Sequence, residues 1–221
     1  MKKGKRREFL LAIFSAGLLG AAIPVSADVV NGNFSGGNTG FSNGYTFDAV
    51  DPPNVGGHYT VDTTPFNFNS GGANFGDHTT GTGLMLIADG NLTSGVPVWS
   101  ESVAVVPNTD YLFTFYSAPW GERNGSGVDP SPATLVTTAN GVQIGSTLNL
   151  VSTDGTWSKF AGTFNSGALS NISLEITDSN TTFIGNDFAI DDISLVPEPN
   201  TLIIGLSGAT CLLLRMRRIK I

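Results

Sequence analysis

The segment from residue 28 to residue 199 alternates short runs rich in β-branched and aromatic residues with clusters of Gly, Asn, Asp and Pro. Such runs are typical of half-buried strands, and the clusters are typical of tight turns. No amphipathic helix of any length is evident between them. The predicted strands cover residues 84–88, 98–106, 111–116, 134–138, 156–164, 172–176 and 187–195. This pattern predicts an all-β fold of eight or nine strands in two sheets, a jelly-roll sandwich.

The run 156–164 illustrates how such a strand divides its side chains between two environments. Successive side chains of a strand point to opposite faces. Phe160 and Phe164 therefore share one face, and Trp157 and Lys159 share the other. This division predicts a strand with one buried and one exposed face.

The charge of this segment is strongly negative. Its basic residues are Arg123 and Lys159, 2 against 17 acidic residues, which gives a formal charge of −15 compared with −7 for the whole chain. Such a field repels nucleic acid, so we expect no nucleic-acid partner. It would attract divalent cations and cationic partners, although acidic, lysine-poor surfaces also keep exported proteins soluble.

Cysteine usage excludes two kinds of chemistry from the segment. The single cysteine, Cys211, lies in an apolar run near the C-terminus. The segment therefore has neither a disulfide nor a thiol nucleophile, and it has no cysteine-ligated zinc. Its length is that of one ordinary domain, which can bury a sufficient core by itself.

The N-terminus has the composition of an export signal. Basic residues at positions 2–7 precede an apolar stretch over residues 9–23, and small residues follow at positions 25–27. This order predicts a signal peptide over residues 1–27, cleaved after Ala27. The pair Arg6-Arg7, followed by Glu8-Phe9-Leu10, resembles the twin-arginine signal, so both the general secretory route and the twin-arginine route stay open.

The C-terminus contains three elements in a fixed order. Pro197-Glu198-Pro199 precedes an apolar run over residues 201–214, and a basic cluster that includes Arg215, Arg217 and Arg218 follows. This tail, residues 197–221, resembles the PEP-CTERM sorting signal of Gram-negative bacteria. The resemblance implies export, a single transmembrane helix before processing, cleavage by an exosortase-type protease, and association with exopolysaccharide. The apolar run is short for a membrane span, and the basic cluster is expected on the cytoplasmic side.

The two ends of the segment 28–196 carry a second resemblance. It opens with residues 29–34 (VVNGNF), contains Val98-Trp99-Ser100, and closes with residues 185–195 (GNDFAIDDISL). These motifs resemble the galactose-binding-like jelly rolls, a superfamily that includes many carbohydrate-binding modules. The resemblance implies that the first and last strands lie close together. A fold match alone does not establish a function.

The same resemblance implies a structural calcium site. Related sugar-binding jelly rolls hold calcium between the opening segment and an Asp of the closing strand, which Asp191 matches by position. The family has Glu after the opening Phe, whereas this chain has Ser35 after Phe34, so Asn33 or the carbonyl groups of residues 36 and 37 would have to replace that ligand. Calcium needs six to eight oxygen ligands. The alternative is that Asp191 and its neighbour form a solvated strand end with a β-bulge.

Asp77 and His78 form a second constellation, in a loop that resembles an Asp-His-Thr-x-Gly segment of exported modules. They could be a ligand pair or an acid–base pair, because imidazole titrates near neutral pH. No nucleophile is linked to them in the sequence. We expect instead that both side chains stabilise the loop by hydrogen bonds to backbone groups.

The best sequence candidate for a sugar-binding aromatic residue is Trp120, which precedes a polar loop. Sugar binders stack pyranose rings on exposed aromatic side chains and bind hydroxyl groups with amides and carboxylates. Trp120 is followed by Glu122, Arg123 and Asn124, which could supply such polar groups. A packing role for Trp120 is an equal alternative, and Trp99 and Trp157 are expected to pack in strands.

No motif in the sequence indicates catalysis. A pair of carboxylates at the spacing used by glycoside hydrolases will occur by chance among this many acidic residues. We therefore expect no enzymatic activity. The sequence predicts an exported, non-enzymatic cell-surface or matrix protein associated with exopolysaccharide; a carbohydrate-binding module with a specific glycan ligand is the alternative, ahead of a glycoside hydrolase.

Overall fold

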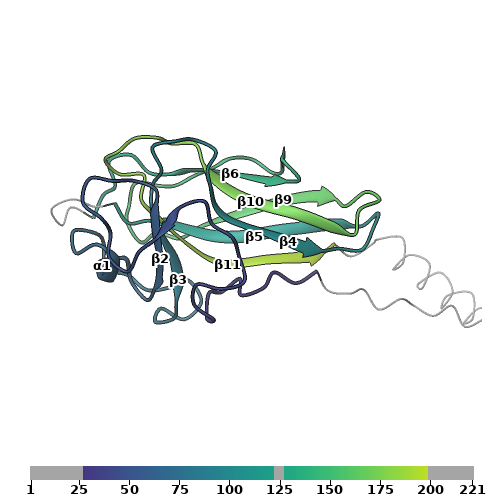
Figure 1. The fold of residues 1–221 in the computed structure, drawn as a ribbon, viewed down its shortest axis with the longest axis horizontal. Helices are drawn as coiled ribbons and strands as arrows, with labels where there is room; N and C mark the ends of the chain where they lie inside the picture. The colour runs from purple at the N-terminus through teal and green to yellow at the C-terminus, as the bar shows by residue number, and fades with distance from the viewer. Residues whose placement is uncertain (1–26, 122–126, 199–221) are drawn as a thin grey trace, which may run out of the picture.

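The computed structural model describes residues 27–121 and 127–198, which form a two-sheet β-sandwich (Figure 1). The predicted signal helix and transmembrane helix lie outside the described residues. Within the described ranges, no helix is long and apolar enough to cross a membrane. The prediction of an all-β, two-sheet sandwich is confirmed.

Eleven strands and one short helix make up the described part. In chain order they are β1 (Thr46–Phe47), β2 (His58–Asp62), α1 (Pro65–Phe68), β3 (Met85–Asp89), β4 (Pro97–Ala104), β5 (Asp110–Pro119), β6 (Thr134–Ala139), β7 (Val142–Gln143), β8 (Leu148–Asn149), β9 (Ser158–Asn165), β10 (Asn171–Asp178) and β11 (Phe188–Pro197).

The strands are divided between two sheets. The larger sheet has the order β1-β2-β3-β11-β5-β9, and the smaller one has the order β4-β10-β6-β7, with β8 also paired to β6. From β3 to β6, and again from β9 to β11, each strand lies in the sheet opposite to the one before it. The chain thus crosses repeatedly between the sheets, as in a jelly roll.

All seven strands predicted from the sequence are present, with shifted ends. The count of eight or nine was too low, because β1, β7 and β8 have only two residues each. Such short strands carry no periodic signal. β2, with the sequence HYTVD, alternates polar and apolar residues over its five positions but was also missed.

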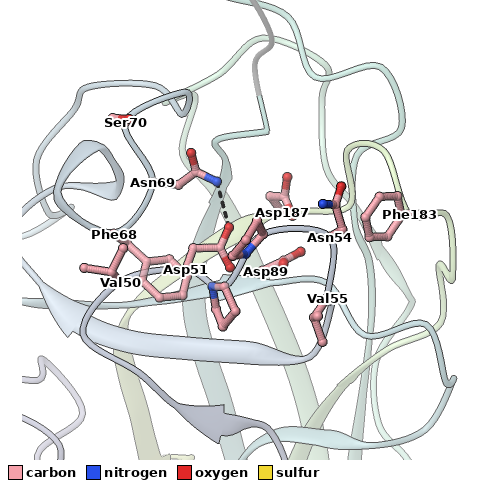
Figure 2. Close-up of a pocket in the computed structure, with 12 residues that line it drawn as sticks. Val50, Asp51, Asn54, Val55, Phe68, Asn69, Ser70, Asp89, Phe183 and Asp187 are labelled. Atoms are coloured by element: carbon pink, nitrogen blue, oxygen red, sulfur yellow. Dashed lines mark hydrogen bonds between the residues drawn. The ribbon is translucent and has the colours of Figure 1, made fainter.

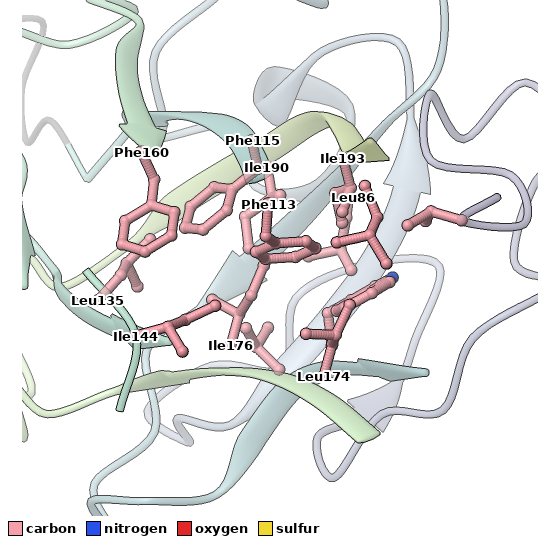
Figure 3. Packing of buried hydrophobic residues seen from close by; sticks show 14 of the residues in the cluster. Leu86, Phe113, Phe115, Leu135, Ile144, Phe160, Leu174, Ile176, Ile190 and Ile193 are labelled. Atoms are coloured by element: carbon pink, nitrogen blue, oxygen red, sulfur yellow. The ribbon is translucent and has the colours of Figure 1, made fainter. Parts of the chain in front are cut away.

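The core lies between the two sheets and is rich in aromatic side chains (Figure 3). Phe113 stacks on Trp99 of the smaller sheet at 5.9 Å between ring centroids. Phe115 stacks on Phe160 at 4.9 Å. Phe160 is buried while its neighbour Lys159 is exposed, which confirms the division of faces predicted for this strand.

The turn chemistry read from the sequence also appears in the structure. Asn140 and Gly141 connect β6 to β7 with φ angles of +49° and +76°. A two-residue hairpin turn of this kind needs positive φ at both positions, which Asn and Gly tolerate best. The sequence Asn-Gly therefore fixes this hairpin locally.

The resemblance implied that the first and last strands lie close together, but the first strand, β1, is separated from β11 by β2 and β3. The opening segment, which is not a strand, lies against β11 instead. The Ile193 N–H donates to the Gly32 carbonyl oxygen at 2.8 Å. A side chain at Gly32 would collide with the Ile193 carbonyl, so the close approach requires glycine. Pro197 still pairs with Tyr111 at the end of β11, and the Glu198 N–H donates to Asp110.

The aromatic core gives a direct prediction for stability. Phe113→Ala removes a fully buried ring that contacts both sheets, so it should lower the free energy of unfolding by about 3–5 kcal/mol. Urea denaturation of the purified protein would measure this loss. Val142→Ala, at a position that is 68% exposed, should change it by less than about 0.5 kcal/mol. A loss at Phe113 as small as that at Val142 would contradict the packing described here.

Candidate functional site

Trp120 is buried rather than exposed, so it does not offer a ring face to a sugar. Its side chain is 2% exposed and packs edge-on against Phe68 at 6.1 Å. Its Nε1–H donates to the Ala88 carbonyl oxygen at 3.1 Å. The interpretation of Trp120 as a stacking platform is corrected: the indole joins the α1 segment to the outer face of the larger sheet. Its three polar neighbours, Glu122, Arg123 and Asn124, lie outside the described residues.

The loop with Asp77 and His78 is only partly as expected. Asp77 accepts hydrogen bonds from the backbone N–H groups of Thr80 and Gly83, so its predicted loop-stabilising role is confirmed. Although burial opposes ionisation, these hydrogen bonds outweigh it and lower the pKa of Asp77. His78 instead contacts a distant strand: its Nδ1 lies 2.7 Å from Asp192 Oδ2, and its ring stacks on Tyr116 at 3.6 Å.

The predicted calcium ligands, Asn33 and Asp191, accept hydrogen bonds from two different loops. Asn33 Oδ1 accepts from the Ser35 hydroxyl, and Asp191 Oδ2 accepts from the backbone N–H of His78 at 3.0 Å. Within residues 27–121 and 127–198, no group of three or more His, Cys, Asp or Glu residues could hold a metal ion. The predicted calcium set, with Asn33, backbone carbonyls and one Asp, is of another kind, so the calcium site stays a prediction. Of the alternative, a solvated strand end with a β-bulge, the structure shows the register shift between Asp191 and Ser194, but Asp191 itself is fully buried within β11.

Of the predicted sorting motif, the structure describes Pro197 and Glu198 alone, at the end of the larger sheet. Pro199, Arg215, Arg217 and Arg218 lie outside the described residues. The sorting role of the tail remains a prediction.

A polar cavity of about 330 Å³ lies at one end of the larger sheet (Figure 2). Three segments that are far apart in sequence surround it: the loop between β1 and β2, the end of α1, and the junction of β3 with the start of β11. Its lining residues are Val50, Asp51, Pro52, Pro53, Asn54, Val55, Phe68, Asn69, Ser70, Asp89, Phe183 and Asp187. We call this cavity the loop-end pocket.

Three carboxyl groups meet in the loop-end pocket, those of Asp51, Asp89 and Asp187, which we call the carboxyl cluster. β3 and β11 pair antiparallel with Phe188 opposite Ala88, so Asp187 and Asp89 face each other across the two strands. The Asp89 carboxyl lies within hydrogen-bond range of both other carboxyls. Two carboxylates repel at this distance, so such contacts require shared protons.

The environment of the cluster favours its protonated state. Burial, reinforced by the neighbouring charge of Asp89, raises the pKa of Asp187 well above its usual range. Burial likewise raises the pKa of Asp89 to about 7. Burial also raises the pKa of Asp51, while the side-chain amide of Asn69, which donates to Asp51 Oδ2 at 2.7 Å, lowers it. The cluster thus holds protons near neutral pH.

Gly90 positions the cluster. A side chain at this residue would collide with both the backbone and the side chain of Asn186, so the chain can leave β3 beside Asn186 only with glycine. The Gly90 N–H in turn donates to Asp187 Oδ1 at 3.3 Å. Asp89 and Gly90, at the end of β3, thereby pack against Asn186 and Asp187, which precede β11.

Apolar side chains line other parts of the loop-end pocket. Phe183 is 41% exposed and Val55 is 48% exposed, whereas Phe68 is fully buried and contacts Trp120. The amide of Asn54 adds a further polar group, and its φ of +63° places it in a left-handed turn that asparagine tolerates. The pocket therefore combines hydrogen-bonding groups with exposed apolar surface.

Sequence reasoning missed every residue of this pocket except Asp187, which it placed only as a strand end. Asp89 follows a predicted strand and Asp51 lies in a loop rich in proline, so neither stands out among the acidic residues of the chain. The available signal was the position of Asp89 and Asp187 at two strand ends. That signal becomes informative only when the pairing of β3 with β11 is known.

No protein-family model matches the chain, and no curated protein matches it. Among solved structures, the Stig cyclase Fisc from Fischerella sp. TAU, in complex with an indole compound, has a TM-score of 0.55 at 15% identity over 79% of this chain and 98% of that chain. A tandem of two CBM22 domains from Paenibacillus barcinonensis Xyn10C has a TM-score of 0.49 at 16% identity, over 80% of this chain and 47% of that one. A family 16 carbohydrate-binding module has a TM-score of 0.44 at 17% identity, over 76% and 98%. At such identities the likeness to the cyclase shows the sandwich fold alone.

The carboxyl cluster makes stability depend on pH. A carboxyl whose pKa is raised by folding binds more protons in the folded state than in the unfolded state, so stability falls as pH rises through its folded pKa. The melting temperature should therefore fall as pH rises from about 4, near the ordinary pKa of an aspartate, to about 7, the folded pKa of Asp89, and this fall is the step that Asp89 contributes. Asp89→Asn should remove this step, as measured by thermal unfolding across the range.

Asp28→Asn is the matched control, because Asp28 is exposed and outside the cluster. It should leave the pH dependence unchanged. A melting temperature for Asp89→Asn that falls as steeply near pH 7 as that of the unmodified protein would contradict the assignment.

Proposed function

We propose that this protein is a non-enzymatic, exported glycan-binding protein of the bacterial cell surface or extracellular matrix, and that it binds sugar in the loop-end pocket. The observation that carries the proposal is the convergence of carboxyl and amide groups beside exposed apolar side chains. Sugar rings need both, because they combine hydroxyl edges with an apolar face.

The polar groups of the pocket suit hydroxyl recognition. Asp51 and Asn69 are already held to each other by a hydrogen bond, so their remaining donor and acceptor positions have a fixed direction. Prior ordering of this kind lowers the entropy lost on binding. Phe183 supplies an aromatic ring at the rim, where an apolar sugar face could rest.

The volume of the pocket limits the length of glycan that it can enclose. At about 330 Å³ it lies near the lower end of the range for small-molecule sites. We infer that it holds one or two sugar units, with the rest of a longer glycan outside.

The arrangement of the carboxyl groups supports binding rather than hydrolysis. Glycoside hydrolases separate their two carboxyls by about 5–9.5 Å so that substrate or water fits between them. In the loop-end pocket Asp89 is in hydrogen-bond range of both neighbouring carboxyls, which leaves no room for substrate between Asp89 and either of them.

The export and anchoring part of the proposal rests on the two ends of the sequence. The sequence has a basic N-terminus followed by an apolar stretch, and a Pro-Glu-Pro tail with a basic end. In this proposal an exosortase-type protease processes the tail, and the bound glycan is an exopolysaccharide component. Mass spectrometry of the mature protein would test the processing, since retention of Arg218 would contradict it.

A glycan array probed with the purified full-length protein tests the binding function. Binding to a defined glycan should appear, and Phe183→Ala should weaken it by about tenfold, because aromatic contacts contribute roughly 0.5–1.5 kcal/mol beyond their buried area. Phe66→Ala is a matched control: Phe66 is 46% exposed on α1 but does not line the pocket. It should bind like the unmodified protein. A blank array, or equal loss in both variants, would refute the proposed site.

A further inference from the structure

We propose that a second, apolar pocket, at the end of the sandwich where β11 ends, binds residues 201–206 of the chain's own C-terminal tail. We call it the tail-end pocket. The inference does not depend on the glycan-binding function, and it concerns the chain before any processing of its tail. It rests on the lining of the pocket, on the place where the described chain ends, and on the sequence that follows.

The tail-end pocket has a volume of about 490 Å³ and lies between the two sheets. The end of β9 lines it from the larger sheet, and the β6–β7 hairpin and β10 line it from the smaller sheet. No charged residue is among the described residues that line it. Ile144 and Ile172 are buried there, whereas Val142 is 68% exposed and Leu169 is 50% exposed. Apolar surface of this kind gains free energy when an apolar segment covers it.

The described chain ends close to this pocket. β9 and β11 are both antiparallel to β5, which lies between them, so the two strands end on the same side of the sandwich (Figure 1). Asp110, at the start of β5, joins the two ends. Its carbonyl oxygen accepts from the Glu198 N–H at 2.8 Å, and its carboxylate accepts from Asn165 Nδ2 at 2.7 Å. Since Asn165 lines the pocket, the tail leaves the sandwich two strands away from it.

The linker between this point and the apolar run is long enough to reach the pocket. Adjacent strands lie about 4.7–4.9 Å apart, so the backbone of residue 198 is about 10 Å from that of Asn165. Residues 199–201 can extend over about 10 Å. The apolar run, which begins at residue 201, can therefore start at the lining of the pocket.

The first residues of the apolar run match the pocket in chemistry. Residues 201–206 (TLIIGL) are uncharged, and four of them are Leu or Ile. A cavity of about 150 Å³ can hold a benzene molecule, so the tail-end pocket, at about 490 Å³, has room for more than one aliphatic side chain. A short linker gives the tethered segment an effective concentration in about the millimolar range, so modest contacts are sufficient for docking.

Charge favours this occupant over a second copy of the chain or a lipid surface. The tail beyond residue 198 has four basic residues, at positions 215, 217, 218 and 220, and no acidic one. The segment 28–199 is strongly acidic, so it attracts this tail. The same acidic field repels a second copy of itself and repels anionic lipid.

Disulfide trapping in the full-length protein tests the inference. Cys211 is the only cysteine of the chain, so Cys211→Ser gives a background without thiols. Thr201→Cys is then combined with either Ala168→Cys or Thr163→Cys. Both positions are exposed, but Ala168 lines the pocket, whereas Thr163 points to the outer face of β9, directly across β5 from Val196. Thr163 thus controls for collisions that depend only on the length of the linker.

Oxidation in dilute, detergent-free buffer should link residues 201 and 168 about tenfold faster than residues 201 and 163, because docking holds the tail at the pocket. Val142→Asp places a charge in the apolar lining and should lower the faster rate to the slower one. Val151→Asp, at a position that is 45% exposed and outside the pocket, should leave the faster rate unchanged. Matching melting temperatures would show that the variants are folded.

The outcomes separate the tail from other occupants of the pocket. Equal rates at the two positions, or a faster rate that persists in Val142→Asp, would overturn the inference. A disulfide that forms only between two chains, seen as a dimer on a non-reducing gel, would overturn it in favour of a second copy. A disulfide that forms only when phosphatidylcholine vesicles are present would overturn it in favour of a lipid surface. None of these results changes the outcome of the glycan array, so the two proposals fail separately.

Discussion

The central position of β11 in the larger sheet is the constraint on which the rest of the structure depends. β11 pairs with β3 on one side and with β5 on the other, and the Gly32 carbonyl of the opening segment accepts a hydrogen bond from Ile193 of the same strand. Alternate residues of β11 enter the core, as Phe188 and Ile190 do. The residues between them point to the outer face, where the pocket and the His78 loop lie.

This alternation explains how one strand serves both stability and recognition. Residue 187 precedes the buried Phe188 and therefore points outward, toward Asp89. Asp191 also points outward and anchors the loop of His78. The bulge after Asp191 turns Asp192 to the same side, with a φ of +52°. A shift of one residue in the register of β11 would exchange the apolar core for these carboxyls, so burial of Phe188 and Ile190 also fixes the acidic groups.

The sandwich could be predicted from the sequence because the patterns that indicate its strands and turns lie within short stretches of the chain. Each long strand carries its own alternation, and the Asn140-Gly141 turn needs no tertiary contact to be recognised. The short β1, β7 and β8 could not be found, since two residues show no period.

The loop-end pocket could not be predicted, because it depends on pairing between segments about 100 residues apart. Trp120 shows the same limit: its position before a polar loop suggested exposure, but its neighbours Phe68 and Ala88 come from distant segments and enclose it.

The burial of Trp120 bears directly on how the carboxyl cluster is maintained. Trp120 packs on Phe68, and its backbone N–H donates to the Asp187 carbonyl oxygen at 3.1 Å. The aromatic packing thus holds α1 and the start of β11 in place, and with them Asn69 and Asp187. A cluster of partly protonated carboxyls tends to separate as it ionises, because like charges repel. The rigid support behind the pocket resists that separation. Trp120 therefore contributes to the pocket through the packing behind it, and not through a ring face offered to a ligand.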